Sequence, residues 1–242
     1  MVRTVLTTLF FIPFFVLFTL FIIACLFLLA LIPGTRELMR AVELMWARGV
    51  VRAAGIQLEI SGLEVETGTN CLFIGNHQSW LDIPVFLTAL ARYRPRFVAK
   101  RSLFSIPLFG RGMKMLGHQA IDRTNNRQGM RDIHEVAGTL DHGESVFIFP
   151  EGTRNPNSRQ LQDFHIGAFV LALKTQQPVV PIIIQGTGKV LQRGSLMIRP
   201  GPVRVRAAAP VRIADRYTLK QRTQFKNDIR AVMQDLLTES TV

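Results

Sequence analysis

The fold is decided by the stretch Cys71–Asp82, whose sequence is CLFIGNHQSWLD. Its first four residues, Cys71–Ile74, form a short apolar run that is typical of a buried strand. A mainly polar segment follows, and Pro84–Leu90 then shows the composition of a helix. A buried strand that passes through a polar loop into a helix is the repeating unit of an α/β sheet, in which functional residues gather where strands end.

Short apolar runs alternate with helical patterns along the rest of the chain, with no internal repeat and no clear second domain. We therefore expect an α/β fold with a mostly parallel mixed sheet flanked by helices. The expected strands are Leu58–Ile60, Cys71–Ile74, Phe97–Ala99, Ala120–Ile121, Val146–Phe149, Val179–Ile184, Leu196–Ile198 and Val203–Val205, the last two flanking a turn at Pro200–Pro202. The expected helices are 36–54, Pro84–Leu90, Met130–Leu140, Ile166–Lys174 and Thr218–Thr238.

The composition indicates a globular chain with an anionic partner. Hydrophobic residues make up 48% of the 242 residues, and the formal net charge is +12. A strongly basic protein binds either nucleic acid or anionic lipid. The two cysteines, Cys25 and Cys71, lie in unrelated segments. No structural disulfide is expected between them, in agreement with a reducing compartment.

The N-terminal segment favours lipid over nucleic acid, because no charged residue occurs from Thr4 to Thr35. Roughly 20 apolar residues are enough to span a bilayer. A helix here would tilt, break at Pro13 or form a bent hairpin in one leaflet. The alternative is a cleaved signal peptide that begins at Arg3, but the apolar run is too long and no A-x-A pattern follows it. We expect residues 1–35 to be a membrane anchor, as a helix or helical hairpin, and residues 36–242 to form the main domain.

Flanking charges predict the orientation of this anchor. Only Arg3 precedes the apolar run, whereas Arg36, Arg40, Arg48 and Arg52 follow it. Positively charged flanks remain in the cytoplasm. The protein is therefore expected to be membrane-bound, with its main domain on the cytoplasmic side.

His77 and Asp82 are the first candidate catalytic residues. Five residues apart, they cannot meet on one regular helix, but they can meet if His77 lies on the turn before the helix and Asp82 in its first turn. A carboxylate bonded to one imidazole nitrogen would orient the ring, and the other nitrogen would accept a proton from a hydroxyl. The alternative is structural, because Ser79 and Asp82 also have the spacing of a capping box.

The second candidate segment is Phe149–Arg154, which directly follows the strand residues Ser145–Ile148. Gly152 permits close approach of the backbone, and Glu151 can accept hydrogen bonds from hydroxyl groups. Arg154 offers a planar fork that suits phosphate. The alternative is an ordinary loop with a surface ion pair.

Further cations follow two other expected strands. Lys100 and Arg101 come after one strand, and Arg123 follows Ile121 and Asp122 after the next. Together they can converge on an anion, although each taken alone is more often a solvated charge. The stretch Ser102–Gly117 mixes apolar and basic residues, which suits a membrane surface or an acyl-chain entrance. Its alternative is a buried loop with exposed cations.

Several common sites do not occur in the sequence. It contains no G-x-S-x-G, no H-E-x-x-H, no C-x-x-C and no G-x-x-x-x-G-K-[ST]. A serine acyl-enzyme therefore has no support. The remaining histidines do not show metal-ligand spacing, so neither a metal site nor a cofactor is expected.

Four motifs occur in a fixed order: Asn-His-x-x-x-x-Asp at 76–82, Ile-Asp-Arg at 121–123, Phe-Pro-Glu-Gly-Thr-Arg at 149–154 and Val-Pro-Ile at 180–182. Over about residues 70–190 the chain resembles the 1-acylglycerol-3-phosphate acyltransferase family of glycerolipid synthesis. The resemblance implies His77 as general base and Asp82 as its orienter. It also implies that Arg123, Glu151, Gly152 and Arg154 bind the glycerol phosphate, and that Pro181 shapes the site. His165 departs from the lysine that the family often has there.

The expected reaction transfers a fatty acyl group to the free sn-2 hydroxyl of 1-acylglycerol-3-phosphate and gives phosphatidic acid. The donor would be an acyl-CoA or acyl carrier protein thioester, used as a co-substrate. One alternative is acylation of another lysolipid, such as a lyso-aminolipid. A second is a basic membrane-tethered adaptor, which would not need His77 and Asp82. Nucleic acid is not an expected partner, because the sequence has no helix-turn-helix or RNA-binding signature.

Overall fold

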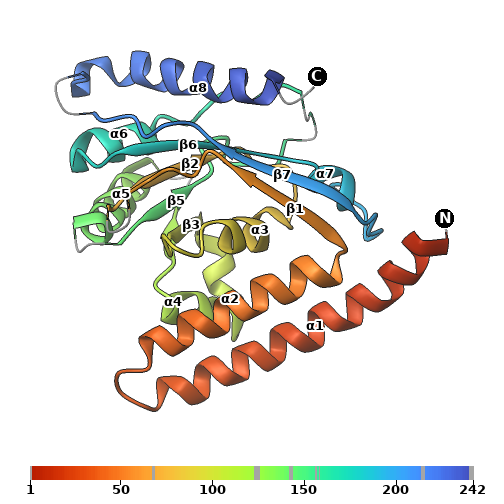
Figure 1. Cartoon of the computed structure of the whole chain (residues 1–242). Coiled ribbons are helices and arrows are strands. Elements are labelled where there is room, and N and C mark those ends of the chain that lie inside the picture. Colours follow the sequence, from red (N-terminus) through yellow and green to blue (C-terminus); the bar gives the residue numbers. More distant parts are fainter. Residues whose placement is uncertain are drawn as a thin grey trace.

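The computed structural model describes residues 2–66, 69–122, 126–141, 144–155, 157, 159–213 and 216–239. Among them a seven-stranded sheet has the order β1-β7-β6-β2-β5-β3-β4. Only the pair β6 and β7 is antiparallel. The expected mostly parallel mixed sheet is confirmed (Figure 1). The strands are β1 Ile56–Ser61, β2 Leu72–Gly75, β3 Arg96–Lys100, β4 Gln119–Ile121, β5 Val146–Ile148, β6 Val179–Gln185 and β7 Gly201–Ala207.

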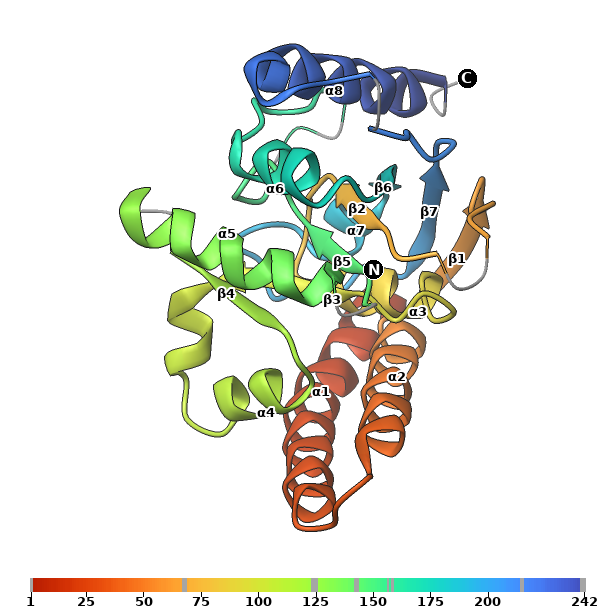
Figure 2. The same ribbon diagram turned by 90° about the vertical axis from the view of Figure 1, so that its left-hand side faces the viewer.

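Helices cover both faces of this sheet. Helices α2 and α3 pack on one face, and α5, α6 and α8 pack on the other (Figures 1 and 2). The larger helices are α1 Val2–Ala30, α2 Arg36–Ala53, α3 Asp82–Ala89, α4 Phe109–Met115, α5 Asn126–Asp141, α6 Gly167–Thr175 and α8 Arg222–Glu239. The shorter ones are η1 Arg101–Ser105, α7 Thr187–Val190 and η2 Leu219–Gln221.

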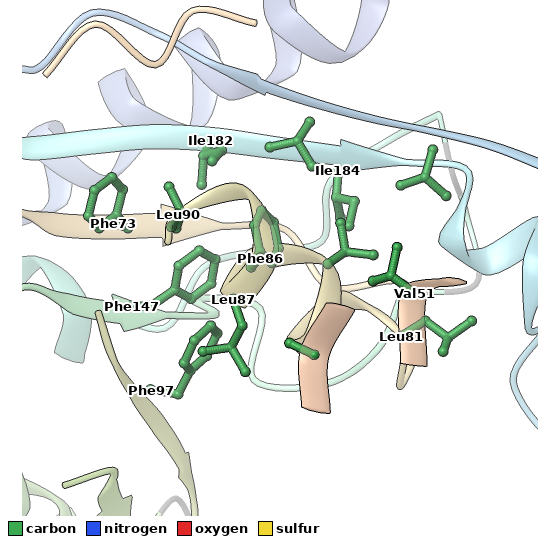
Figure 3. Packing of buried hydrophobic residues seen from close by; sticks show 14 of the residues in the cluster. Val51, Phe73, Leu81, Phe86, Leu87, Leu90, Phe97, Phe147, Ile182 and Ile184 are labelled. Atoms are coloured by element: carbon green, nitrogen blue, oxygen red, sulfur yellow. The ribbon is translucent and has the colours of Figure 1, made fainter. Parts of the chain in front are cut away.

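The core under α3 is aromatic. Phe73, Phe97 and Phe147 from three strands meet Phe86 of α3, as Figure 3 shows. Side chains alternate along a strand, so Val146 and Ile148 lie in the other core with α5 and α6. At Gly75 an added Cβ would lie 2.4 Å from the Phe147 ring. The end of β2, where the polar loop begins, therefore accommodates only glycine beside this ring.

The N-terminal segment forms a helical hairpin. Helix α1 packs along α2 (Figures 1 and 2), and the Trp46 Nε1 group donates a hydrogen bond of 3.0 Å to the Thr19 hydroxyl. Pro13 lies inside α1 without ending it. By length and composition alone α1 is long and apolar enough to cross a membrane, and little of it is buried against the rest of the protein.

Two local expectations were wrong. Leu196–Ile198 is not a strand, since only Ile198 forms one bridge, to Leu191. Pro200–Pro202 is not a turn between strands, because Gly201 and Pro202 already pair with β1. Proline is tolerated near the first residue of a strand, where its fixed φ fits an extended chain. The segment Ser102–Gly117, for which a buried loop was the alternative interpretation, contains most of η1 and all of α4.

Candidate active site

The loops after β2 and β5 leave the sheet side by side. The two strands are parallel and adjacent, with Ile74 opposite Ile148. Asn76 ties the first loop to β6, because its side chain accepts a hydrogen bond from the Ile184 amide at 2.7 Å and donates one to the Ile184 carbonyl at 3.0 Å. The His77 loop is thereby held between its two neighbouring strands.

His77 and Asp82 are hydrogen-bonded. The distance from Nδ1 of His77 to Oδ2 of Asp82 is 2.7 Å. Asp82 is completely buried, and the imidazole stacks on the Phe149 ring with centroids 4.2 Å apart. A carboxylate bonded to Nδ1 fixes the tautomer and leaves Nε2 to accept a proton.

The Asp82 carboxylate also organises the surrounding backbone. Its Oδ2 atom accepts hydrogen bonds from the amides of Gln78 at 2.5 Å and Ser79 at 2.9 Å. Its Oδ1 atom accepts one of 2.5 Å from the hydroxyl of Thr187, the first residue of α7. Asp82 is the first residue of α3, and the N-cap position at Leu81 has no side-chain cap hydrogen bond. The Asp82 amide bonds the Ser79 carbonyl and not its hydroxyl, so the reciprocal capping box is not formed and the carboxylate instead orients His77.

Glu151 is buried and holds the same loop from the β5 side. Its Oε1 atom accepts a hydrogen bond of 3.1 Å from the His77 amide. Its Oε2 atom accepts bonds of 3.0 Å from the Asn155 side chain and 3.0 Å from the Gln162 amide. Burial raises the pKa of Glu151, although these three hydrogen bonds act in the opposite direction. Both oxygens of Glu151 are thus engaged by the protein, and the residue acts on the site through the position of His77.

Arg154 lies beside this group. Gly152 has a φ of +68° and turns the chain, a conformation that glycine adopts without strain. The Arg154 guanidinium lies over the Trp80 ring, 4.6 Å from its centroid. Burial lowers the pKa of Arg154, Arg193 lowers it further and Asp82 acts in the opposite direction. A guanidinium remains charged nonetheless, so a cation stands close to the His77–Asp82 pair.

A histidine oriented by a buried carboxylate, with a cation beside it at the end of a parallel sheet, suits transfer of a group to a hydroxyl. The sequence matches the family model described as Acyltransferase over residues 57–185, just over half of the chain. The chain belongs to the acyltransferase family. The matched range contains the His77, Asp82 and Glu151 loops of this acyltransferase.

The acyltransferase is similar to several curated 1-acyl-sn-glycerol-3-phosphate acyltransferases. It is 39% identical to a chloroplastic protein of Brassica napus over 63% of this chain and 44% of that protein. It is 35% identical to a chloroplastic protein of Arabidopsis thaliana over 81% of this chain and 54% of that protein. It is 29% identical to the protein of Escherichia coli over 73% of this chain and 70% of that protein. The chain spans about half the length of the two plant relatives. The crystal structure of the Thermotoga maritima 1-acyl-sn-glycerophosphate acyltransferase shares its fold, with a TM-score of 0.80, 24% identity and coverage of 100% and 97%.

The other candidate cations of the acyltransferase lie on the far side of β5. Lys100 ends β3 and pairs with Ile121 of β4, at the same edge of the sheet but two strands from β2. Arg101 forms an ion pair with the buried Asp132 instead of facing the site. Arg123 lies outside the described residues. The structure brings together His77, Asp82, Glu151, Gly152 and Arg154, and it places Lys100 farther along the same edge.

The backbone amides next to His77 are already occupied. The His77 amide is bonded to Glu151, and the Gln78 and Ser79 amides are bonded to Asp82. They are therefore unsuitable as donors to an oxyanion in this arrangement. Within the described part of the chain, no three His, Cys, Asp or Glu side chains gather as metal ligands would.

Three residues that organise the site were missed by sequence reasoning. Asn155 contacts Glu151, Thr187 contacts Asp82, and Phe149 lies against His77. Phe149 belongs to the Phe-Pro-Glu-Gly-Thr-Arg motif, whose aromatic position was a usable signal. Thr187 follows β6 and the Val-Pro-Ile motif, and nothing local distinguishes it from a helix-capping residue.

Proposed function

We propose that this acyltransferase transfers a fatty acyl group from a thioester to the sn-2 hydroxyl of 1-acylglycerol-3-phosphate and forms phosphatidic acid. The observation that carries the proposal is the His77–Asp82 hydrogen bond, with the Arg154 guanidinium beside it. The names of the relatives support the same reaction. The thioester, from acyl-CoA or acyl carrier protein, is a co-substrate, and no resident cofactor takes part in the proposed steps.

The reaction proceeds by direct attack on the thioester. Nε2 of His77 accepts the proton of the acceptor hydroxyl while the hydroxyl oxygen bonds to the thioester carbonyl carbon. Asp82 stabilises the imidazolium through Nδ1–H. The tetrahedral oxyanion then collapses, the carbon–sulfur bond breaks, and the thiolate takes the proton from Nε2. The ester and the free thiol leave, and His77 is again neutral.

Arg154 is suited to the acceptor phosphate. Its fork can form two charge-assisted hydrogen bonds to phosphate oxygens, and the Trp80 ring holds the guanidinium plane. Lys100, at the end of β3, would extend this cation group, whereas Arg123, a further phosphate ligand implied by the family resemblance, lies outside the described residues. Glu151 and Gly152 contribute by shaping the loop that carries Arg154 and positions His77.

Helix α1 is proposed to hold the domain at the membrane, where the acceptor resides. Residues 1–35 form the anchor and residues 36–242 the catalytic domain. Helix α4 packs on α1, so that an added Cβ at Gly112 would lie 3.8 Å from Leu26. Ile106 and Leu108, just before α4, are exposed and would continue the apolar surface of α1 toward the bilayer. The arginines that follow α1 support a cytoplasmic position of the domain, because positive flanks remain on that side.

One assay tests the reaction. Detergent-purified protein is incubated with a panel of lysolipids crossed with acyl-CoA and acyl carrier protein donors, and products are identified by mass. Phosphatidic acid from 1-acylglycerol-3-phosphate is the expected product. If only a lyso-aminolipid is acylated, that lipid replaces 1-acylglycerol-3-phosphate as the proposed acceptor. If no lysolipid is acylated, the interpretation as a basic membrane-tethered adaptor is favoured. The His77→Ala protein is the control for non-enzymatic transfer.

A further inference from the structure

A basic cavity lies on the opposite side of His77 from Lys100. It measures about 510 Å³ and is formed by α7, the segment that follows α7, Gln78 and Asn155. Lys189, Arg193 and Arg199 line it, and none of the lining residues within the described part of the chain is acidic. Gln78 is the residue next to His77, so the cavity adjoins the candidate active site.

The three cations of this cavity are available to a ligand. Among the described residues, none of their side chains forms an ion pair with a carboxylate. Arg193 instead donates a hydrogen bond of 3.2 Å to the Arg154 carbonyl. Unpaired positive charges that share a cavity repel one another, and a bound anion relieves that repulsion. The cavity therefore suits a phosphate group.

Gln78 adds a second requirement for the ligand. The residue is 4% exposed, and its side-chain oxygen is buried without a hydrogen-bond partner. A buried acceptor without a partner is costly, and a ligand with an N–H group can satisfy it. The cavity thus offers an acceptor close to His77 and cations beyond it.

We propose that this cavity binds the phosphopantetheine arm of the thioester donor, with the arm's phosphate at Lys189, Arg193 and Arg199. The arm is common to acyl-CoA and acyl carrier protein. It carries its thioester at one end, amide N–H groups along its length and a phosphate at the other end, in the order that His77, Gln78 and the cations require. The acceptor lacks such an amide, and its hydroxyl is used at His77. The inference rests on the proposed function and assigns the donor phosphate to this cavity, next to the acceptor cation Arg154, whose carbonyl Arg193 contacts.

The test removes two cations and leaves the Arg193 contact to Arg154 intact. In the full-length Lys189→Ala/Arg199→Ala protein, the KM for acyl-CoA and acyl carrier protein thioesters should rise by about 10- to 100-fold, as for lost charge-assisted hydrogen bonds. The KM for 1-acylglycerol-3-phosphate should change less than about twofold, since each cation contact acts locally. The matched control is Arg212→Ala/Lys220→Ala. Arg212 follows Val211, which pairs with Val179 at the other end of β6, and both KM values should stay unchanged.

Inhibition by fragments of the donor identifies the group that is bound. Phosphopantetheine should inhibit the unchanged enzyme more strongly than pantetheine, and the difference should vanish in Lys189→Ala/Arg199→Ala. Three results for Lys189→Ala/Arg199→Ala would overturn the assignment. They are a rise in the acceptor KM alone, an unchanged donor KM, and a loss confined to binding of anionic vesicles. These outcomes require an enzyme that transfers acyl groups. Absence of transfer by the unchanged protein would instead remove the proposed function.

Discussion

The Thr187 hydroxyl donates a hydrogen bond of 2.5 Å to Oδ1 of Asp82, and both residues are completely buried. The Oδ2 atom of Asp82 accepts hydrogen bonds from Nδ1 of His77 and from the amides of Gln78 and Ser79. Thr187 therefore fixes the rotation of the carboxylate that orients His77. Because Thr187 begins α7, the same short helix positions Asp82 and carries Lys189 of the basic cavity.

Thr187→Val should lower kcat without a comparable change in either KM. A hydrogen bond to a charged group contributes about 1.5–3 kcal/mol, so the expected loss is about 10- to 100-fold in rate. Thr187→Ser retains the hydroxyl and should recover most of kcat. The measurement is steady-state kinetics with both substrates, beside a melting curve. A lower Tm with unchanged kcat in the folded fraction would show that Thr187 serves stability alone.

His77 and Asp82 should behave as one unit. Removing a general base costs about 10²–10⁴ in rate, so His77→Ala should lose nearly all turnover while it folds normally. Asp82→Asn should lose much of it, because the imidazole is no longer oriented. Residues that act together are not additive, and the double variant should match His77→Ala. Near-native turnover of folded His77→Ala would exclude the base mechanism.

Arg154→Ala should mainly raise the KM for 1-acylglycerol-3-phosphate. Loss of a charge-assisted hydrogen bond to phosphate corresponds to about 10- to 100-fold in apparent affinity. Arg154→Lys should recover part of it, since lysine lacks the planar fork. Trp80→Leu is the companion variant and should give a smaller rise, because it removes only the ring under the guanidinium. A rise in the thioester KM alone would move Arg154 to the donor side.

The order of strands and helices was predictable because each kind of element has its own hydrophobic pattern. Val179–Ile184 and Cys71–Ile74 are continuous apolar runs, as strands buried on both faces require. The contacts of the site were harder to predict. Thr187 and Asp82 are separated by 105 positions, and only the pairing of β2 with β6 brings them together. The stacking of Arg154 on Trp80 depends on a side-chain direction that no spacing encodes.

Glu144 should make the protein sensitive to acid. Hydrogen bonds of 2.8 Å and 2.8 Å from Arg96 lower its pKa to about 2 from the usual 4.5, with Arg36 and Arg40 acting in the same direction. A depressed carboxyl pKa stabilises the fold above pH 4.5, and that contribution is lost as the pH falls toward about 2.

Glu144→Gln is the variant that isolates this effect. It should unfold more easily at pH 7, by about 1.5–3 kcal/mol, the contribution of hydrogen bonds to a charged group, because the buried Arg96 loses its charged partner. As the pH falls from 4.5 toward about 2, the difference from the unchanged protein should shrink. Denaturant unfolding at several pH values measures both. A constant difference from pH 7 to pH 2 would show that the charge of Glu144 is not the cause.

The exposed stripe of α1 should control attachment to the membrane. Leu6, Leu17 and Leu28 are each separated by 11 residues, about three helical turns, so they lie on one side of α1. All three are more than half exposed, and Leu17 is 67% exposed.

Leu17→Lys would place a charge among lipid chains at a cost of about 2.5–3.5 kcal/mol near the bilayer centre. At neutral pH, where the lysine is charged, the variant should shift toward the soluble fraction. High salt alone should not release the unchanged protein, because burial of apolar surface does not depend on charge screening. Leu219→Lys, at an exposed leucine of η2 (49% exposed), is the matched control and should stay with the membrane. Equal retention of Leu17→Lys and Leu219→Lys, or complete release of the unchanged protein by salt, would show that α1 does not hold the enzyme in the bilayer.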